Sequence, residues 1–265
     1  MTNKKLSSEI TSYDILKTLA VVLMIIDHIG AYFFPDSMEW RVVGRLCVPM
    51  WMFLIGYARS RDVSPRLWVG ACLLVGADVI VGWPILSLNI IFTILLVRLI
   101  LDRVVVLFER SQMMRNAVGL GIVLLFIPTM VVDYGTSALA LAMYGYYVRR
   151  YQEGACDLSF MRGVMVFAFI VFVVGQQISF GFSSVQFGLV VGGLLFVTLM
   201  LQYFNAREFS KLGQKIGVIG KSAFKLCGRY FLEIFVVHLL IFKFTALLLG
   251  HEGMGWFNLT FVSSN

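Results

Sequence analysis

Hydrophobic positions come in long unbroken runs along this chain, separated by short segments that hold most of the charged residues. Nine of these runs approach the ~17–25 residues that a helix needs to cross a bilayer. The expected fold is therefore all-α, a polytopic transmembrane helix bundle of about nine spans. The expected spans are residues 14–34, 41–58, 66–83, 88–108, 117–132, 134–151, 162–180, 182–204 and 229–249.

Three of these spans are less regular than the others. The spans 117–132 and 134–151 are short, and the second half of 88–108 carries three charged residues. The pattern leaves open whether this last segment leaves the membrane near Val97 and continues as an interfacial helix.

The composition also indicates a membrane protein. Hydrophobic residues make up 59% of the 265 residues and charged residues 14%, against about 45–50% and about 25% in soluble domains. The length and the lack of a Pro- or Ser-rich linker predict one transmembrane domain over residues 1–265. The four cysteines and three histidines show no spacing typical of a metal site, so no metal is expected.

Basic residues are distributed unevenly among the segments that join the spans. Segments rich in Lys and Arg alternate with segments poor in both, which by the positive-inside rule places the N-terminus in the cytoplasm and the C-terminus outside. The net charge of +7 follows from this topology, so we expect a lipid bilayer and no nucleic acid as partner. The basic set is Lys4, Lys5, Arg59, Arg61, Arg66, Arg110, Arg115, Arg149, Arg150, Arg162 and the long basic loop 205–229.

The first expected span holds four ionisable residues, Asp14, Lys17, Asp27 and His28. A charged group at the middle of a bilayer costs at least ~2.5–3.5 kcal/mol, so such residues usually face a protein-lined cavity and function there. The separation of Lys17 and His28 is about three helical turns, which places them on one face about 16 Å apart. Asp27 points about a quarter-turn away from that face. We interpret His28 as a catalytic base.

Given this orientation, polar residues of several spans fall in the external half of the membrane. Arg45 lies there, one turn past Arg41, and a buried arginine needs an acidic partner, for which Asp27 and Asp133 are the candidates. Pro49 cannot donate to the carbonyl of Arg45, so we expect a kink that leaves this carbonyl free. Such a polar layer is typical of a pocket that opens outward. Its other members are Asp78, Asn89, Gln176, Gln177 and Lys243, with His238 near the middle of the last span.

Some members of this layer have simpler explanations. Asp78, Gln176 and Gln177 are equally well explained as hydrogen-bonding groups between helices. Lys243 is expected to extend to the outer membrane interface, with its ammonium group in water.

A membrane-embedded histidine near an aspartate and an arginine suits general-base catalysis. The histidine would deprotonate an amine or hydroxyl that attacks an activated acyl group, and an arginine or amide donor would stabilise the oxyanion. The residue pattern shows that these parts are present, but it does not name the reaction.

Successive blocks of the chain resemble the TraX family, in the same order. The resemblance implies a multi-pass acetyltransferase of the bacterial inner membrane, with acetyl-CoA as donor and the N-terminus of a pilin as acceptor. Because many members are not linked to conjugation, the acceptor stays open between a pilin and a glycan or lipid of the cell envelope. The blocks are DILKTLAVVLMIIDHIG (14–30), GRLCVPMWMFLIGYARSR (44–61), NIIFTILL (89–96), VDYGTSALALAMYGYY (132–147) and RYFLEIFVVHLLIF (229–242).

A more distant similarity links the chain to acyltransferase family 3 and the transmembrane acyltransferase superfamily. The first helix of that family carries a pattern resembling LDxLR, followed after ten residues by a histidine. Residues 13–17 and His28 have this spacing, with Lys17 in the arginine position. The similarity implies that His28 is catalytic and that Lys17 supplies a charge on the donor side. The predicted site consists of the catalytic residues His28, Asp27 and Arg45 and the donor-binding residues Lys17, Asp14, Asn89 and His238.

Two other classes of function are compatible with the sequence. Intramembrane Asp, His and Arg residues are equally expected in the proton relay of a small transporter or proton-coupled flippase. Against that class, the halves of the chain show no inverted repeat, and nine spans do not divide evenly. The third class is a non-enzymatic assembly factor that binds a membrane partner such as a pilin subunit.

Overall fold

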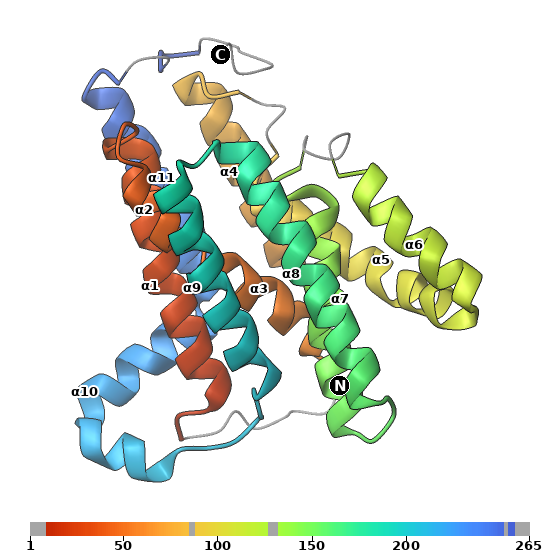
Figure 1. The fold of residues 1–265 in the computed structure, drawn as a ribbon. Coiled ribbons are helices and arrows are strands. Elements are labelled where there is room, and N and C mark those ends of the chain that lie inside the picture. The colour runs from red at the N-terminus through yellow and green to blue at the C-terminus, as the bar shows by residue number, and fades with distance from the viewer. Residues whose placement is uncertain (1–8, 85–87, 127–131, 252–253, 258–265) are drawn as a thin grey trace.

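The computed structural model describes residues 9–84, 88–126, 132–251 and 254–257. These residues form an all-α fold of eleven helices, with no β-strand beyond two isolated bridges (Figure 1). Lys4 and Lys5, which support the expected orientation, lie outside the described residues. The helices are α1 (Ser12–Phe33), α2 (Met38–Gly44), α3 (Cys47–Tyr57), α4 (Pro65–Val81), α5 (Ile90–Arg110), α6 (Gln112–Leu124), α7 (Gly135–Gln152), α8 (Leu158–Phe180), α9 (Ser184–Gln202), α10 (Ser210–Arg229) and α11 (Phe231–Leu248).

Four helices in the described part of the chain are long and apolar enough to cross a membrane: α1, α8, α9 and α11. The chain is therefore a multi-pass membrane protein. Each expected span overlaps a helix, but the span 41–58 is divided between α2 and α3. The span 117–132 overlaps only the second part of α6, which ends at Leu124, and residues 127–131 lie outside the description. The segment 205–229, expected as a loop, consists largely of helix α10.

The helix break between α2 and α3 is formed by Arg45 and Leu46, which adopt a turn. Pro49 follows in the first turn of α3, where its missing N–H removes no helical hydrogen bond. The expected departure from a straight helix is thus confirmed. The expected free carbonyl is wrong, because the carbonyl of Arg45 accepts a hydrogen bond from the Val48 amide at 3.3 Å.

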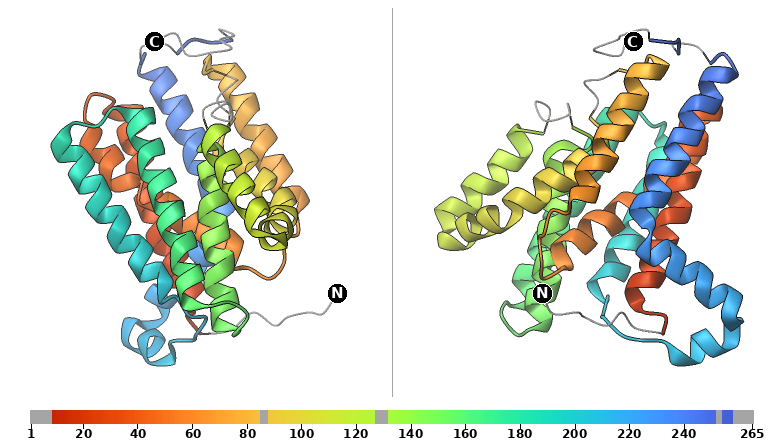
Figure 2. Two further views of the ribbon diagram at one scale, coloured as in Figure 1. Left: turned by 45° about the vertical axis from the view of Figure 1, so that its right-hand side comes forward. Right: turned by 180° about the vertical axis from the view of Figure 1, so that it is seen from behind.

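Helix α1 packs against α2, α3, α10 and α11. Figure 2 shows α1 and α11 side by side, both rising from the end of the molecule that carries α10. A glycine permits the closest contact of α2 with α1, because a Cβ on Gly44 would lie 2.4 Å from the Cα of Asp27. This contact places α2 directly against the face of α1 that carries Asp27.

The turn before α7 is held against the start of α5. The Asn89 side chain caps α5 by accepting from the Ile91 amide at 3.1 Å, and Thr93 Oγ1 donates to the Asp133 carbonyl at 2.7 Å. Tyr134 follows with a φ of 69°, a left-handed conformation that costs a residue with a Cβ roughly 1–2 kcal/mol. Such strain is retained where the surroundings fix it, and it clusters at functional sites.

Candidate functional site

A cavity of about 230 Å³ lies between α1, α2, α3, α4, α5, α11 and the turn before α7. Its wall combines aliphatic and aromatic side chains with polar groups from most of these elements. All three predicted catalytic residues and the predicted donor ligand Asn89 are part of the wall. The charged and amide side chains in it are Asp27, His28, Arg41, Arg45, Asp78, Asn89, Asp133 and Lys243.

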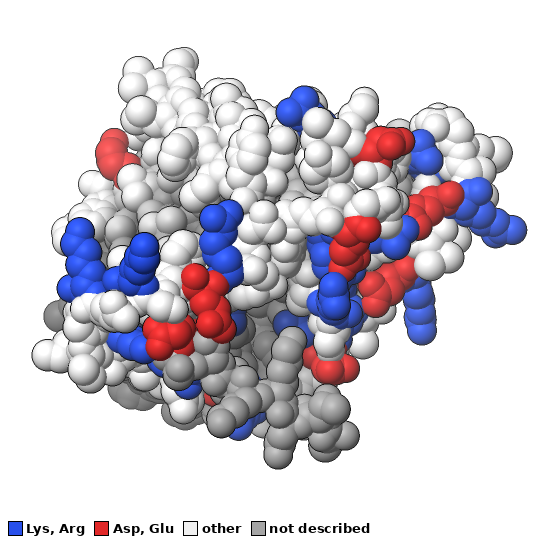
Figure 3. Space-filling model, turned by 90° about the horizontal axis from the view of Figure 1, so that it is seen from below, with Lys and Arg blue, Asp and Glu red and all other residues white. Residues whose placement is uncertain are grey.

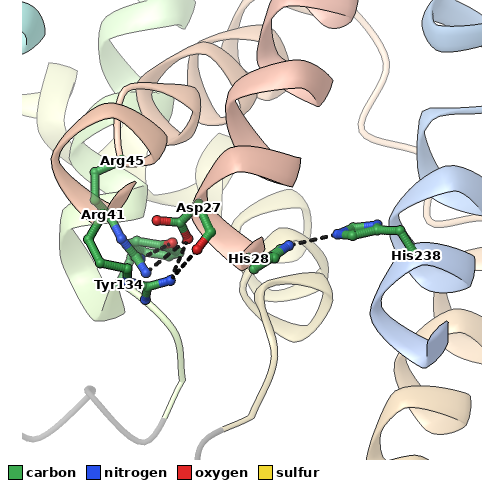
Figure 4. A network of polar contacts seen from close by, with 6 residues as sticks. All are labelled: Asp27, His28, Arg41, Arg45, Tyr134 and His238. Carbon is green, nitrogen blue, oxygen red and sulfur yellow. Dashed lines mark hydrogen bonds and ion pairs between the residues drawn. The ribbon is translucent and has the colours of Figure 1, made fainter. Parts of the chain in front are cut away.

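Asp27 points toward α2 and binds two arginines through one carboxylate oxygen (Figure 4). Its Oδ2 lies 2.9 Å from Arg41 Nη1 and 3.0 Å from Arg45 Nη2. Oδ1 has no hydrogen-bond partner among the described residues. The expectation that Arg45 pairs with an acidic residue is confirmed, with Asp27 as the partner. A buried pair of this kind contributes little net stability, whereas loss of one partner costs roughly 3–5 kcal/mol.

Arg45 connects this ion pair to Tyr134. Its Nη1 donates to the hydroxyl oxygen of Tyr134, and its guanidinium lies 4.4 Å from the ring centroid of Phe180. A guanidinium has no acceptor, so the hydroxyl proton of Tyr134 is left to donate to another group. Tyr134 lines the cavity. Tyr134 is therefore a hydroxyl donor on the cavity wall, and the guanidinium of Arg45 polarises this hydroxyl.

His28 points away from Asp27, toward α11, and contacts His238 (Figure 4). The His28 Nδ1 atom lies 2.7 Å from His238 Nε2, and the ring planes meet at 25°. The rings of Phe235 and Phe242 pack on His238, with centroids 5.7 Å and 5.4 Å away. Thus the two predicted catalytic residues Asp27 and His28 are adjacent in sequence but belong to separate contact groups.

The hydrogen bonds of the two histidines determine which ring nitrogens carry protons. His238 Nδ1 lies 2.7 Å from the Ile234 carbonyl, which only accepts, so the Nδ1 of His238 carries the proton. In the neutral ring its Nε2 is then an acceptor, and the Nδ1 of His28 must donate to it. The Nε2 of His28 is therefore the unprotonated nitrogen. His28 lines the cavity and His238 does not. His238 therefore contacts His28 from outside the cavity lining.

Lys17 and Asp14 lie in the first turns of α1, at the end of this helix that contacts α10. Lys17 Nζ donates to the Gly228 carbonyl at 3.0 Å and lies 4.7 Å from the ring centroid of Phe231. Asp14 forms a capping box with Thr11 and accepts from its amide at 2.9 Å. Asp14 therefore has a structural role at the start of α1, while Lys17 presents a cation near Phe231, which also lines the cavity.

Lys243 and Asp78 form a second buried ion pair in the cavity wall, between α11 and α4. Their side chains are 6% and 7% exposed. Lys243 also lies 5.7 Å from the ring centroid of Tyr32. The expectation that Lys243 extends to the membrane surface is therefore wrong, because the lysine has a carboxylate partner inside the bundle. The explanation of Asp78 as a group that bonds between helices is confirmed.

Comparison with known proteins decides the family. A family model described as "TraX protein" matches residues 12–246. This chain belongs to the TraX family. It is 25% identical over 244 residues to the uncharacterized protein RP591 of Rickettsia prowazekii, a match that covers 88% of this chain and 92% of that protein. It is 27% identical over 155 residues to Protein TraX of Escherichia coli, with coverage of 56% and 60%. No solved structure matches.

Several polar residues of the cavity wall were absent from the predicted set. They include Asp78, Asp133 and Lys243, together with Arg41 and Tyr134, which contact Asp27 and Arg45. Arg41 lies one turn before Arg45, which places both on the same face of a helix, so its share in the Asp27 contact could have been anticipated. Tyr134 gives a weaker signal, since a tyrosine next to a glycine is common in turns. Among the described residues, no group of three or more His, Cys, Asp or Glu side chains could hold a metal ion.

Proposed function

We propose that this protein is an inner-membrane acyltransferase that moves an acyl group, acetyl in the simplest case, from acyl-CoA to an envelope acceptor. The observation that carries the proposal is the contact of His28 Nδ1 with His238 Nε2, because it leaves the Nε2 of His28, a residue of the cavity wall, as the acceptor nitrogen. Membership of the TraX family supports the choice of reaction, because the sequence resemblance implies pilin acetylation. The proposal includes nine membrane crossings, with the N-terminus in the cytoplasm and the C-terminus outside.

In this proposal His28 is the general base. Its Nε2 accepts the proton of an amine or hydroxyl while that nitrogen or oxygen attacks the thioester carbonyl. When the intermediate collapses, the C–S bond breaks and Nε2 returns the proton to the leaving thiolate. A C–N or C–O bond replaces the C–S bond, and no electrons are gained or lost. The products are the acylated acceptor and CoA with a free thiol.

Tyr134 is the proposed donor to the carbonyl oxygen, where negative charge develops during attack. The interaction with Arg45 polarises its hydroxyl, and a donor already oriented in a cavity of low dielectric strongly stabilises an oxyanion. Asp27 is a positioning residue here, because it holds Arg45 and does not contact His28. This arrangement differs from direct stabilisation of the oxyanion by arginine.

The size of the cavity and the position of Lys17 support an acyl-CoA donor that enters at the end of the molecule that carries α10. A volume of about 230 Å³ lies below the ~300–1,000 Å³ of sites that enclose a drug-sized ligand, so the cavity suits an acyl group and part of the thiol arm. The charged nucleotide part of CoA would remain outside. Lys17 lies over the ring of Phe231, a residue of the cavity wall, and in this proposal it pairs with the phosphates of CoA.

A binding measurement tests this function. Calorimetry on the purified protein in nanodiscs should show saturable binding of acetyl-CoA, and the His28→Ala variant should bind it but not transfer the acetyl group. His251→Ala is the matched control, because His251 does not line the cavity. Absence of saturable binding in the wild-type protein would refute the proposal.

The alternative function is a proton-coupled transporter or flippase. The observation that favours it is the buried pair Lys243–Asp78 in the cavity wall, since buried ionisable pairs also occur in proton relays. A saturable, pH-driven substrate uptake into proteoliposomes, without acetyl-CoA binding, would select this function.

A further inference from the structure

Helix α10 has an exposed strip of apolar side chains on its outer side. Val218 and Ile219 are 82% and 88% exposed, and Leu226 is 54% exposed. Ala223, between them, is exposed as well. Ile219, Ala223 and Leu226 are spaced by four and three residues, so they share one helix face. These exposures show that the described part of the chain leaves the strip uncovered.

The opposite side of α10 is attached to α1 and the residues just before it. Lys221 Nζ lies 2.8 Å from Glu9 Oε1, and Lys17 Nζ donates to the Gly228 carbonyl at 3.0 Å. A Cβ on Gly228 would lie 2.2 Å from Asp14 Oδ1, so the two helices are in close contact. The apolar strip therefore belongs to the side of α10 that faces away from α1.

The position of α10 relates this strip to the membrane surface. Helix α10 ends at Arg229 and α11 begins at Phe231, and both α11 and α1 are long and apolar enough to cross the membrane. Helix α10 therefore lies where two membrane-crossing helices reach the membrane surface, extending away from the bundle (Figure 1). Gly217, with a φ of 71°, divides it, and the apolar strip lies in the second half.

The charge of α10 indicates which lipids it contacts. The helix contains five basic residues and no acidic one, and Lys221, Lys225 and Arg229 follow one another at intervals of four. Figure 3 shows the face of the molecule at this end, where Lys and Arg side chains gather with acidic ones among them. A helix with an apolar face and basic flanks is typical of binding to a surface of anionic lipids.

We propose that α10 is a membrane-surface helix that binds anionic lipid headgroups. Val218, Ile219 and Leu226 enter the boundary between headgroups and acyl chains, and the basic side chains other than Lys221, which pairs with Glu9, contact the phosphates. The membrane is a better occupant than a second copy of the chain, because α10 continues directly into a membrane-crossing helix. Helix α1, on which it packs, also exposes the apolar side chains Leu19 and Val22.

The test places a polarity-sensitive fluorophore on α10 of the full-length protein. The four native cysteines are replaced by alanine, and single cysteines are introduced as Ile219→Cys, Leu226→Cys and, for comparison, Gln214→Cys in the first half of the helix. Each labelled protein is reconstituted in nanodiscs of phosphatidylcholine with or without phosphatidylglycerol. Size-exclusion chromatography verifies that each variant is folded.

Labels at positions 219 and 226 should show blue-shifted emission and reduced quenching by aqueous acrylamide, more strongly in the anionic discs. The label at position 214 should remain water-exposed. Lys225→Gln combined with Lys215→Gln should remove the difference between the two lipid compositions. Equal quenching at all three positions in both lipids would overturn the proposal. Shielding that requires two copies of the protein in one disc would also overturn it, in favour of a protein partner.

Discussion

His28 and His238 come from opposite parts of the chain, yet their rings are joined by a hydrogen bond of 2.7 Å between Nδ1 and Nε2. The Ile234 carbonyl fixes the proton on the far side of His238, so the pair has a defined direction of donation. The consequence is a basic Nε2 on His28 at the cavity wall. In the proposed function His238 is a positioning residue, because its polar contacts among the described residues are with His28 and the Ile234 carbonyl.

The first prediction concerns His238 as a positioning residue. His238→Gln should keep activity within about tenfold of the wild type, because a glutamine oxygen also accepts from His28 Nδ1. His238→Leu, of similar size but without an acceptor, should lose a large part of the ~10²–10⁴-fold that a general base contributes. The measurement is kcat with acetyl-CoA for the two variants. Equal loss in both would show that His238 does not act by accepting this proton.

The second prediction concerns Tyr134. Tyr134→Phe retains the ring but removes the hydroxyl, so kcat should fall by about 10²–10³-fold, the usual effect of losing one oxyanion donor. The Tm should fall less than with Asp27→Asn, because Tyr134→Phe leaves one buried donor of Arg45 unpaired but keeps its counter-ion. Asp27→Asn is the comparison, and it should lower the Tm because Arg45 loses its buried counter-ion. A Tyr134→Phe variant with full kcat would exclude Tyr134 as the donor.

The third prediction concerns the donor end of α1. Lys17→Gln removes the cation that lies against Phe231 of the cavity wall, and the KM for acetyl-CoA should rise about tenfold, equivalent to ~1.4 kcal/mol. The kcat should remain close to the wild-type value, since Lys17 is remote from His28. Lys211→Gln, at an exposed position of α10, is the matched control for charge. A drop in kcat at unchanged KM would contradict the assignment to donor binding.

The fourth prediction concerns the pair Lys243–Asp78. Either Lys243→Met or Asp78→Leu alone should destabilise the protein by roughly 3–5 kcal/mol, because the partner is left as an unpaired buried charge. The double variant should regain most of this stability, as an apolar replacement of a buried pair is often neutral. Thermal unfolding in one detergent measures the stability of the two single variants and of the double variant. If the double variant is as unstable as the single ones, the pair has a further role in the cavity.

The sequence predicted α1 and a place for His28 in a polar pocket, because charged residues inside an apolar run have few explanations. It also predicted that Arg45 pairs with an acidic residue, since a buried arginine needs a counter-ion. It did not predict the contact between His28 and His238. Helical periodicity determines which residues share a face of a helix, but it does not determine which helices, 210 residues apart, pack together.

Other differences arise from the same lack of tertiary information. Lys243 was expected at the membrane surface because lysines near helix ends often extend there, but Asp78 on another helix provides a partner inside. The loop expected at 205–229 is a helix because its polar residues alternate with apolar ones at helical spacing. Tyr134 was not selected because its role depends on the turn that α5 holds in place.

The most direct test of the central claim measures whether acetylation of the cell envelope depends on His28. Envelope proteins and glycans are compared by mass spectrometry between cells with the wild-type gene, without the gene, with His28→Ala and with the control His251→Ala. The account predicts an acetylated species in the wild type and the His251→Ala cells, lost without the gene and with His28→Ala, although the variant is membrane-inserted at the normal level. An acetylated species that persists in the His28→Ala cells but is lost without the gene would contradict the assignment of His28 as the catalytic base.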